Sequence, residues 1–257
     1  MNRSAGNTDV LMWVTFISAI RSSWTAAEYA PQSSGTRAYV QPVAQDLAMN
    51  PLIYALDLTG TFVFALSGGL AAARSRLDPF GFVVVTMVTG LGGGTLRNLL
   101  LDLHPVTWVA DPHYLLVCLV AAAMSFTWAR QLESRLRWLR IADALGLGLF
   151  AVAGTQLALT AGTHPGIAVM MGVTTGIAGG VIRDVLCNEV PLVLQQEIYA
   201  LAALAGSLAY VLLDLTGAAP ALSAIVGGVL CSGLRLAAIR WNLSLPAYGG
   251  GRMPPPG

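Results

Sequence analysis

Residues 89–98 read Thr-Gly-Leu-Gly-Gly-Gly-Thr-Leu-Arg-Asn, and residues 175–184 read Thr-Gly-Ile-Ala-Gly-Gly-Val-Ile-Arg-Asp. Each stretch sets glycines ahead of an arginine inside an apolar segment. A glycine in a helix interior costs about 1 kcal/mol relative to alanine, and an arginine within a membrane is rare and expensive. The fold and the function of the chain therefore have to account for both stretches.

The match between the two stretches extends along the chain as an internal repeat. A shift of 86 residues aligns 57–105 with 143–191 without gaps, and 15 of the 49 aligned positions are identical. Apolar composition alone inflates matches of Leu, Val and Ala, but it does not place Asp, Arg and Pro in register. The repeat therefore indicates a duplication of one structural unit.

The composition is that of a membrane protein. Of the 257 residues, 55% are hydrophobic and 11% are charged, against about 25% charged in soluble domains, so membrane lipids are the expected solvent. The basic residues are 14 Arg and no Lys, and no basic patch suggests nucleic-acid binding. The sequence has no motif of a soluble enzyme, so we predict no catalytic activity, no cofactor and no tightly bound metal.

Seven segments are long and apolar enough to span a membrane. They are 52–73, 80–102, 112–130, 142–162, 166–187, 193–214 and 219–239. Each copy of the repeat then holds three helices, an odd number, so the second copy must be inverted relative to the first. The predicted fold is an all-α membrane protein with two inverted three-helix repeats and a seventh helix (3+3+1). Inverted repeats recur in transport proteins, with the solute path at the repeat interface.

The domain boundaries follow from these segments. They are an N-terminal extension 1–48, a first repeat 49–136, a second repeat 137–217, a seventh helix 218–242 and a disordered tail 243–257. The extension is mostly polar and typical of disordered chain. Its apolar run, 10–20, is too short to span a membrane and fits a secretory signal. A translation start at Met49, which would make the extension non-native, fits equally well.

Arginines gather on one side of the predicted membrane. They are Arg74, Arg76, Arg130, Arg135, Arg137, Arg140, Arg235, Arg240 and Arg252. The opposite loops, 103–111, 163–165 and 215–218, hold none. Because cytoplasmic loops are enriched in Arg and Lys, we predict a multi-pass protein of the bacterial inner membrane. Its N-terminus lies outside and its C-terminus lies in the cytoplasm.

The glycines of the two stretches admit two interpretations. Gly92, Gly93 and Gly94 in the second helix, with Gly179 and Gly180 in the fifth, can bend these helices so that backbone carbonyls line a water-filled path. Alternatively, small residues let membrane helices pack closely. Two runs in register, each followed by a buried arginine, favour the bend.

The buried charges predict two ion pairs. Asp57 lies about five residues inside the outer face on the first helix, and Arg97 lies at the same depth on the second. By inversion, Asp143 and Arg183 share a depth near the inner face, so we predict one pair in each repeat. An unpaired arginine would oppose cations, so pairing suits a cation path. The same pairs also suit a purely structural role as clamps between helices.

Two further features concern the candidate path. Asp184 stands where the first repeat has Asn98, so the two halves differ by one charge, and Asp184 makes the inner end more negative if it faces the path. The hydroxyl groups of Thr89, Thr175 and Ser67 can line the path or bond to their own helix backbone.

The stretches 57–69, 92–98 and 179–184 resemble prokaryotic members of the trimeric intracellular cation (TRIC) channel family, over roughly 49–246. The resemblance implies a symmetric homotrimer with one potassium-permeable path per protomer, lined by the second and fifth helices bent at their glycines. The motif positions are Gly92, Gly93, Gly94, Arg97, Gly179, Gly180 and Arg183. Animal members carry a Lys-Glu-Val lipid-binding motif where this chain has Thr95-Leu96-Arg97, so phosphoinositide binding is not expected.

Three functions stay open at this point. The first is a channel for potassium, with sodium as a second candidate ion, and the resemblance favours it. The second is a secondary transporter of a small zwitterion such as glycine, since bacterial members have also been labelled glycine transporters and the buried Arg and Asp residues offer both charges. The third is a structural membrane protein without transport.

Overall fold

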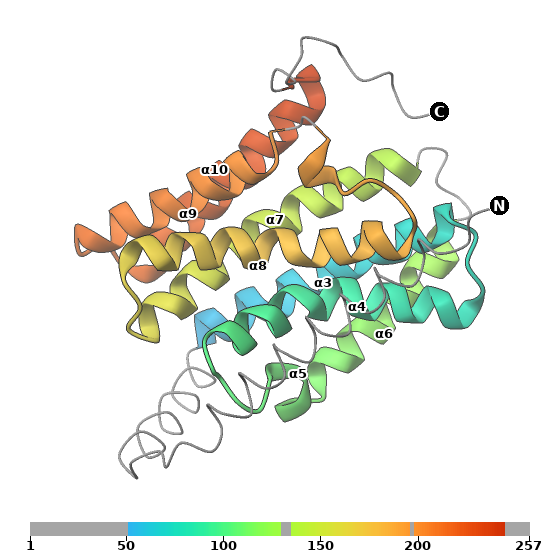
Figure 1. Cartoon of the computed structure of the whole chain (residues 1–257), viewed down its shortest axis with the longest axis horizontal. Coiled ribbons are helices and arrows are strands. Elements are labelled where there is room, and N and C mark those ends of the chain that lie inside the picture. Colours follow the sequence, from blue (N-terminus) through green and yellow to red (C-terminus); the bar gives the residue numbers. More distant parts are fainter. Residues whose placement is uncertain (1–50, 130–134, 196–197, 245–257) are drawn as a thin grey trace, which may run out of the picture. The chain divides into compact units, whose positions relative to one another are not determined.

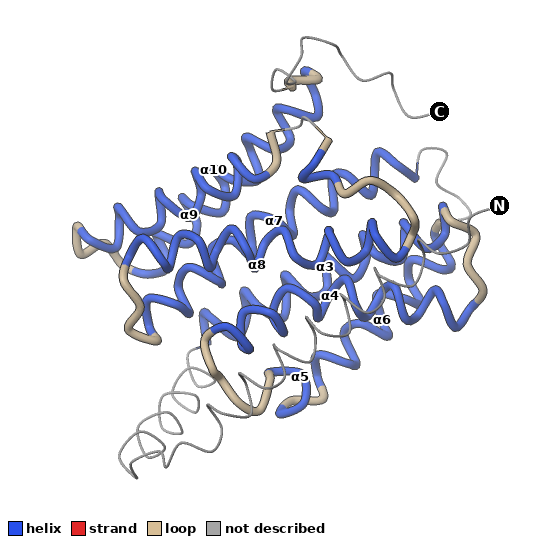
Figure 2. Tube along the Cα trace, viewed as in Figure 1, coloured by secondary structure: helices blue, strands red, loops and turns tan. Residues whose placement is uncertain are grey.

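The computed structural model describes residues 51–129, 135–195 and 198–244, which form helices joined by short loops (Figures 1 and 2). The predictions for 1–48 and for the tail beyond residue 244 fall outside this described part. The helices are α3 Pro51–Arg74, α4 Pro79–Leu100, α5 Thr107–Ala110, α6 His113–Trp128, α7 Arg135–Thr160, α8 Pro165–Leu186, the 3-10 helix η1 Leu192–Leu194, α9 Ala200–Leu215 and α10 Pro220–Trp241.

Proline sets the start of three long helices. Pro79, Pro165 and Pro220 each stand in the first turn of α4, α8 and α10, where the missing N–H costs no hydrogen bond and the fixed φ suits the helix. The side chain of Asp78 also accepts a hydrogen bond from the backbone N–H of Gly81 at 2.7 Å. His164, its equivalent in the second repeat, accepts one from Gly166 at 3.2 Å.

Among the helices that the structure describes, five are long and apolar enough to cross a membrane: α3, α4, α7, α8 and α10. The apolar helices α6 and α9 have 16 residues each, or about 24 Å at 1.5 Å per residue. The predicted segment 193–214 is wrong at its start, because η1 and a loop precede α9. The Asp184 carboxylate accepts a hydrogen bond from the Leu192 N–H at 2.9 Å, which holds this stretch as a separate turn.

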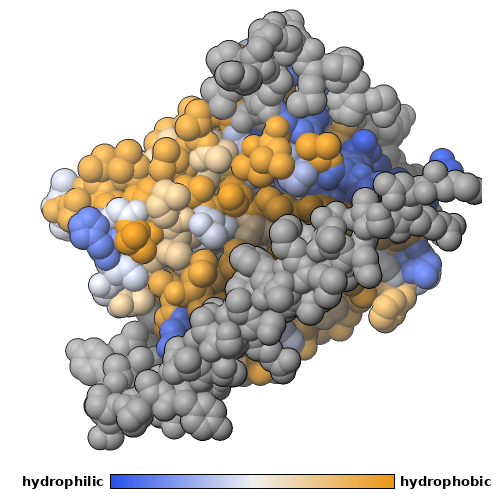
Figure 3. All heavy atoms as spheres, in the orientation of Figure 1, coloured by the Kyte–Doolittle hydropathy of each residue, from blue (hydrophilic) through white to orange (hydrophobic). Residues whose placement is uncertain are grey.

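The predicted start of the fourth segment, residue 142, is also too late, because α7 begins at Arg135. Arg137 and Arg140 therefore lie on a helix and not in a loop. On α9, four leucines spaced by three or four residues, Leu201, Leu204, Leu208 and Leu212, are exposed. They form one apolar stripe, and Figure 3 shows apolar residues over most of the visible surface of α8 and α9.

The two repeats contact each other reciprocally. In Figure 1, α3 and α7 lie side by side and run in opposite directions, as do α4 and α8. Phe64 on α3 and its repeat equivalent Phe150 on α7 stack with ring centroids 5.1 Å apart. A Cβ added at Gly60 would lie 2.6 Å from the Phe150 ring, and one at the equivalent Gly146 would lie 2.9 Å from Phe64. Each contact has its mirror, as an inverted pair requires.

The glycine stretches form the second reciprocal contact. A Cβ at Gly93 would collide with the Thr175 carbonyl oxygen, and a Cβ at the equivalent Gly179 would lie 2.5 Å from the Thr89 carbonyl oxygen. These glycines therefore let the backbones of α4 and α8 touch. Both helices run without interruption through their glycines, so in this structure the stretches serve close packing.

We predict opposite effects for alanine at adjacent glycines of α4. Gly93→Ala should lower the free energy of unfolding by roughly 1–3 kcal/mol, because overpacking forces the two backbones apart. Gly94→Ala should leave stability unchanged or raise it by up to about 1 kcal/mol, because the nearest atom that its Cβ would meet is Arg97 Nη2 at 3.7 Å. Thermal unfolding in detergent measures both. Equal melting temperatures for the two variants would contradict the packing role.

Candidate functional site

The first buried charge cluster ties α3, α4, α5 and α6 together. Arg97 Nη1 and Nη2 donate to the two carboxylate oxygens of Asp57 at 2.7 and 3.1 Å, and the Tyr114 hydroxyl donates to Asp57 Oδ2 at 3.1 Å. Arg97 Nε and Nη2 also donate to Asn98 Oδ1 at 3.1 and 3.0 Å. The Asn98 amide in turn donates to Thr107 Oγ1 at 2.6 Å.

This cluster satisfies its own charges. Arg97 and Asp57 are 1% and 3% exposed, so neither charge is solvated by water. The two-pronged contact between them is the strongest geometry that an arginine and a carboxylate can adopt. Removing one partner of such a pair leaves an uncompensated buried charge. The predicted pair Asp57–Arg97 is therefore formed, and its members depend on each other.

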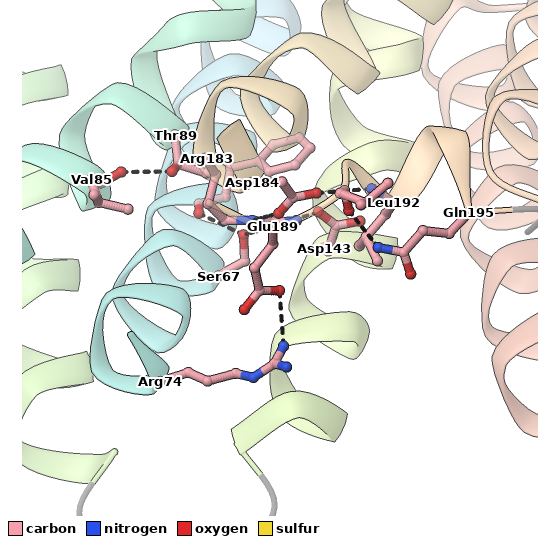
Figure 4. Close-up of polar contacts among 12 residues, drawn as sticks. Ser67, Arg74, Val85, Thr89, Asp143, Arg183, Asp184, Glu189, Leu192 and Gln195 are labelled. Carbon is pink, nitrogen blue, oxygen red and sulfur yellow. Dashed lines mark hydrogen bonds and ion pairs between the residues drawn. The ribbon is translucent and has the colours of Figure 1, made fainter. Parts of the chain in front are cut away.

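The second cluster lies around Arg183 and joins both repeats (Figure 4). Arg183 Nη1 donates to Asp143 Oδ1 on α7 at 2.7 Å and to Ser67 Oγ on α3 at 2.9 Å. Arg183 Nε donates to Asp184 Oδ1 at 2.8 Å. The predicted pair Asp143–Arg183 is thus formed as well. Ser67 is part of this cluster, with its hydroxyl also bonded to the Phe64 carbonyl oxygen at 2.9 Å.

Two residues of the second cluster were missed by sequence reasoning. Tyr199, just ahead of α9, lies with its hydroxyl 3.0 Å from a Cβ added at Gly180. Arg235 of α10 lies over the Tyr199 ring, 4.9 Å from its centroid, and is 1% exposed. From the sequence, Arg235 is counted with the arginines of the C-terminal end, and the structure places it six residues inside the end of α10 and buried. Its position within an apolar helix was the one signal available.

The two clusters are built alike but differ in charge. Asn98 and Asp184 both accept from the arginine that precedes them, and both bond the segment that follows their helix. Asp184 adds a carboxylate that the first cluster lacks, and Arg235 from α10 adds a cation at the same end. Both ends are therefore charge-neutral in total.

The second cluster also keeps spare bonding capacity. Asp143 Oδ2, Arg183 Nη2 and Tyr199 Oη are buried and have no hydrogen-bond partner in the described part of the chain. In the first cluster, by contrast, both Asp57 oxygens accept bonds. The described residues form no group of His, Cys, Asp or Glu arranged to hold a metal ion.

The remaining candidate residues line the α4–α8 contact. The hydroxyl groups of Thr89 and Thr175 donate to the carbonyl oxygens of Val85 and Met171, each at 2.6 Å, so they bond their own helix backbone. A Cβ at Gly92 would lie 2.9 Å from Ile182 of α8. These residues lie at the close contact between α4 and α8.

A small cavity adjoins the first cluster. It has a volume of about 10 Å³, which is room for roughly one water molecule. Asp57, Gly90, Gly94 and Tyr114 are among its lining residues. Space for about one water molecule therefore exists beside the first charge pair.

A loop contact supports this end of the bundle. The Tyr54 hydroxyl donates to Asp111 Oδ2 at 2.9 Å, and the backbone N–H of His113 donates to Asp111 Oδ1 at 2.9 Å. Partial burial favours a higher pKa for Asp111, but these hydrogen bonds and the His113 ring hold the pKa below its usual range. At the other end, Arg74 and Glu189 form a partly exposed ion pair of 3.0 Å.

Comparison with known proteins places the chain in a family. A family model described as Glycine transporter matches residues 54–130 and again 140–214, so its two matches begin 86 residues apart, as the repeat does. The UPF0126 inner membrane protein YadS of Escherichia coli K12 is 45% identical over 199 residues, which cover 77% of this chain and 96% of that protein. A UPF0126 membrane protein of Vibrio cholerae is 42% identical over 200 residues, covering 77% and 83%.

Two solved structures share the fold. A TRIC channel orthologue from Rhodobacter sphaeroides is 44% identical, with a TM-score of 0.72, and the match covers 74% of this chain and 98% of that one. A prokaryotic TRIC channel crystallised in 0.5 M KCl is 34% identical, with a TM-score of 0.70 and coverages of 75% and 98%. Together with the repeated match to the family model, these likenesses show that the chain belongs to the prokaryotic TRIC channel family.

Proposed function

We propose that the protein is a potassium-permeable channel, a homotrimer in which each protomer holds its own path along α4 and α8. The observation that carries the proposal is the neutrality of both buried clusters. Each arginine that would oppose a cation is held by a carboxylate, at 2.7 Å in both pairs. The resemblance to cation channels of solved structure supports the same assignment.

The glycine stretches of α4 and α8 touch, so on this proposal they close the path. We infer that it opens when the two helices bend at these glycines, which frees the carbonyl oxygens of Thr89 and Thr175 to face water. Bare backbone at membrane depth is tolerated where it lines a water-filled cavity. Asp184 then makes the inner end more favourable to cations only if Arg235 moves away.

We further propose how the chain lies in the bacterial inner membrane. Seven helices cross it as 3+3+1, with α6 and α9 as the short crossings, the N-terminus outside and the C-terminus in the cytoplasm. The arginines at the ends of α3 and α10 support this orientation. Lipid contacts are expected on the leucine stripe of α9, and the chain has no phosphoinositide motif.

A second candidate is a secondary transporter of glycine. The unbonded Asp143 Oδ2, Arg183 Nη2 and Tyr199 Oη favour it, since a zwitterion needs an acceptor for its ammonium group and donors for its carboxylate. The description of the family model points the same way.

A recording in planar bilayers tests the channel. Purified protein under a KCl gradient should give unitary currents that reverse near the potassium equilibrium potential. Proteoliposomes with the same protein should take up no labelled glycine above empty liposomes. Saturable glycine uptake without unitary currents would favour the transporter.

Substitutions in the first pair should change current in opposite directions. Asp57→Asn leaves Arg97 uncompensated and should reduce potassium current, whereas Arg97→Gln leaves Asp57 and should raise it. Each single change should destabilise the protein by roughly 3–5 kcal/mol. The double variant restores neutrality, so its current and melting temperature should return toward the wild type. Equal currents in all three variants would exclude this cluster from the path.

Fusions at the C-terminus test the orientation. Green fluorescent protein fused there should fluoresce, because it folds in the cytoplasm, while alkaline phosphatase fused there should be inactive. The same pair of reporters placed after residue 110, in a loop on the opposite side, should give the reverse pattern. Active phosphatase at the C-terminus would overturn the orientation.

A further inference from the structure

The cavity beside the first charge pair has five oxygen-bearing side chains in its wall, together with Leu91, Trp108 and two glycines. It lies between α3, α4, α5 and α6, with the side chains of Asp57, Thr61, Thr95, Thr107 and Tyr114 in its wall. Oxygen is the ligand type that hard cations prefer. Its volume of about 10 Å³ admits roughly one water-sized particle, and a dehydrated potassium ion is of that size.

Several of these oxygens have capacity to spare. Thr61 is 2% exposed and lies in the wall of the cavity. Tyr114 donates its proton to Asp57, which leaves the lone pairs of the Tyr114 oxygen open. Asp57 Oδ1 accepts one bond, from Arg97. A carboxylate offers about four acceptor positions, so Asp57 retains room for a further partner.

The second repeat has aliphatic residues where the first has these threonines. At the same offset of 86, Thr61, Thr95 and Thr107 correspond to Leu147, Val181 and Val193. Leu147 fills the corresponding space, since its Cδ1 would lie 3.1 Å from a Cβ added at Gly176, the equivalent of Gly90. The cavity is therefore a feature of the first repeat, and its oxygen lining departs from the symmetry of the fold.

We propose that this cavity is a binding site for one monovalent cation, which leaves its hydration shell behind on binding. The inference rests on the proposed channel function and adds where the ion dwells. Arg97 already neutralises Asp57, so the site attracts the ion through neutral oxygens and a shared carboxylate. Conduction requires binding that is weak enough to release the ion. The neutralisation of Asp57 by Arg97 keeps the binding that weak. The aliphatic second repeat forms the barrier.

Thallium(I) locates the site directly, because it replaces potassium and scatters X-rays anomalously. Crystals of the full chain grown in a thallium salt should show an anomalous peak in the cavity, within contact of the Thr61 and Tyr114 oxygens. The peak should persist in Thr61→Ser, which keeps the hydroxyl, and vanish in Thr61→Val, which keeps the shape. Thr86→Val, a control that removes a buried hydroxyl bonded to its own helix, should leave the peak unchanged.

Currents give the second measurement. Thr61→Val should reduce unitary conductance by about two- to tenfold, the factor of one lost polar contact, and Thr86→Val should not. A wild-type channel that conducts without a thallium peak in the cavity would overturn the site but leave the channel standing. A thallium peak in a protein that passes no current would support the site and overturn the proposed channel function. A peak that survives Thr61→Val would exclude Thr61 as a ligand.

Discussion

The buried ion pair between an arginine and an aspartate is the interaction on which the rest of the structure depends. Lipid offers no partner for either charge, so each must find the other inside the protein. That requirement fixes the depth of α4 against α3 and of α8 against α7. Once these helices are placed, the segments that follow α4 and α8 are placed too, because Asn98 and Asp184 bond to them.

The glycines act on the same helices through contact. Gly93 and Gly179 let α4 and α8 approach until backbone meets backbone, which brings the two clusters to opposite ends of one interface. A side chain at either position would separate the repeats without touching the charges. The glycines of the motif thus set the packing at the centre of the α4–α8 interface, and its arginines with their carboxylate partners set the charge neutrality at the two ends.

Much of this arrangement could be predicted from the sequence, because a duplication compares the chain with itself. Each copy of the repeat holds one Asp and one Arg at corresponding positions, and three helices per copy invert the second copy relative to the first. These two facts were enough to predict both ion pairs. The start of α9 could not be predicted, since it depends on a carboxylate of α8 bonding to a backbone N–H eight residues later. Arg235 was missed because α10 has no second copy. Whether the glycines bend α4 and α8 or let them pack closely depends on the distance between the two backbones, which a pattern of residues does not give.

The reciprocal contacts bear on how the protein is inserted into the membrane. The surfaces by which the repeats meet are nearly the same, so the contact would form whichever unit pointed outward, provided the two were opposed. Packing therefore does not choose an orientation for the bundle. That choice falls to features outside the interface: the arginines at the helix ends. A change of a few such arginines would invert the molecule in the membrane while preserving its core. The inversion would also exchange the side of the membrane from which an ion reaches the oxygen-bearing side chains of the first repeat and the side from which it reaches the aliphatic residues of the second.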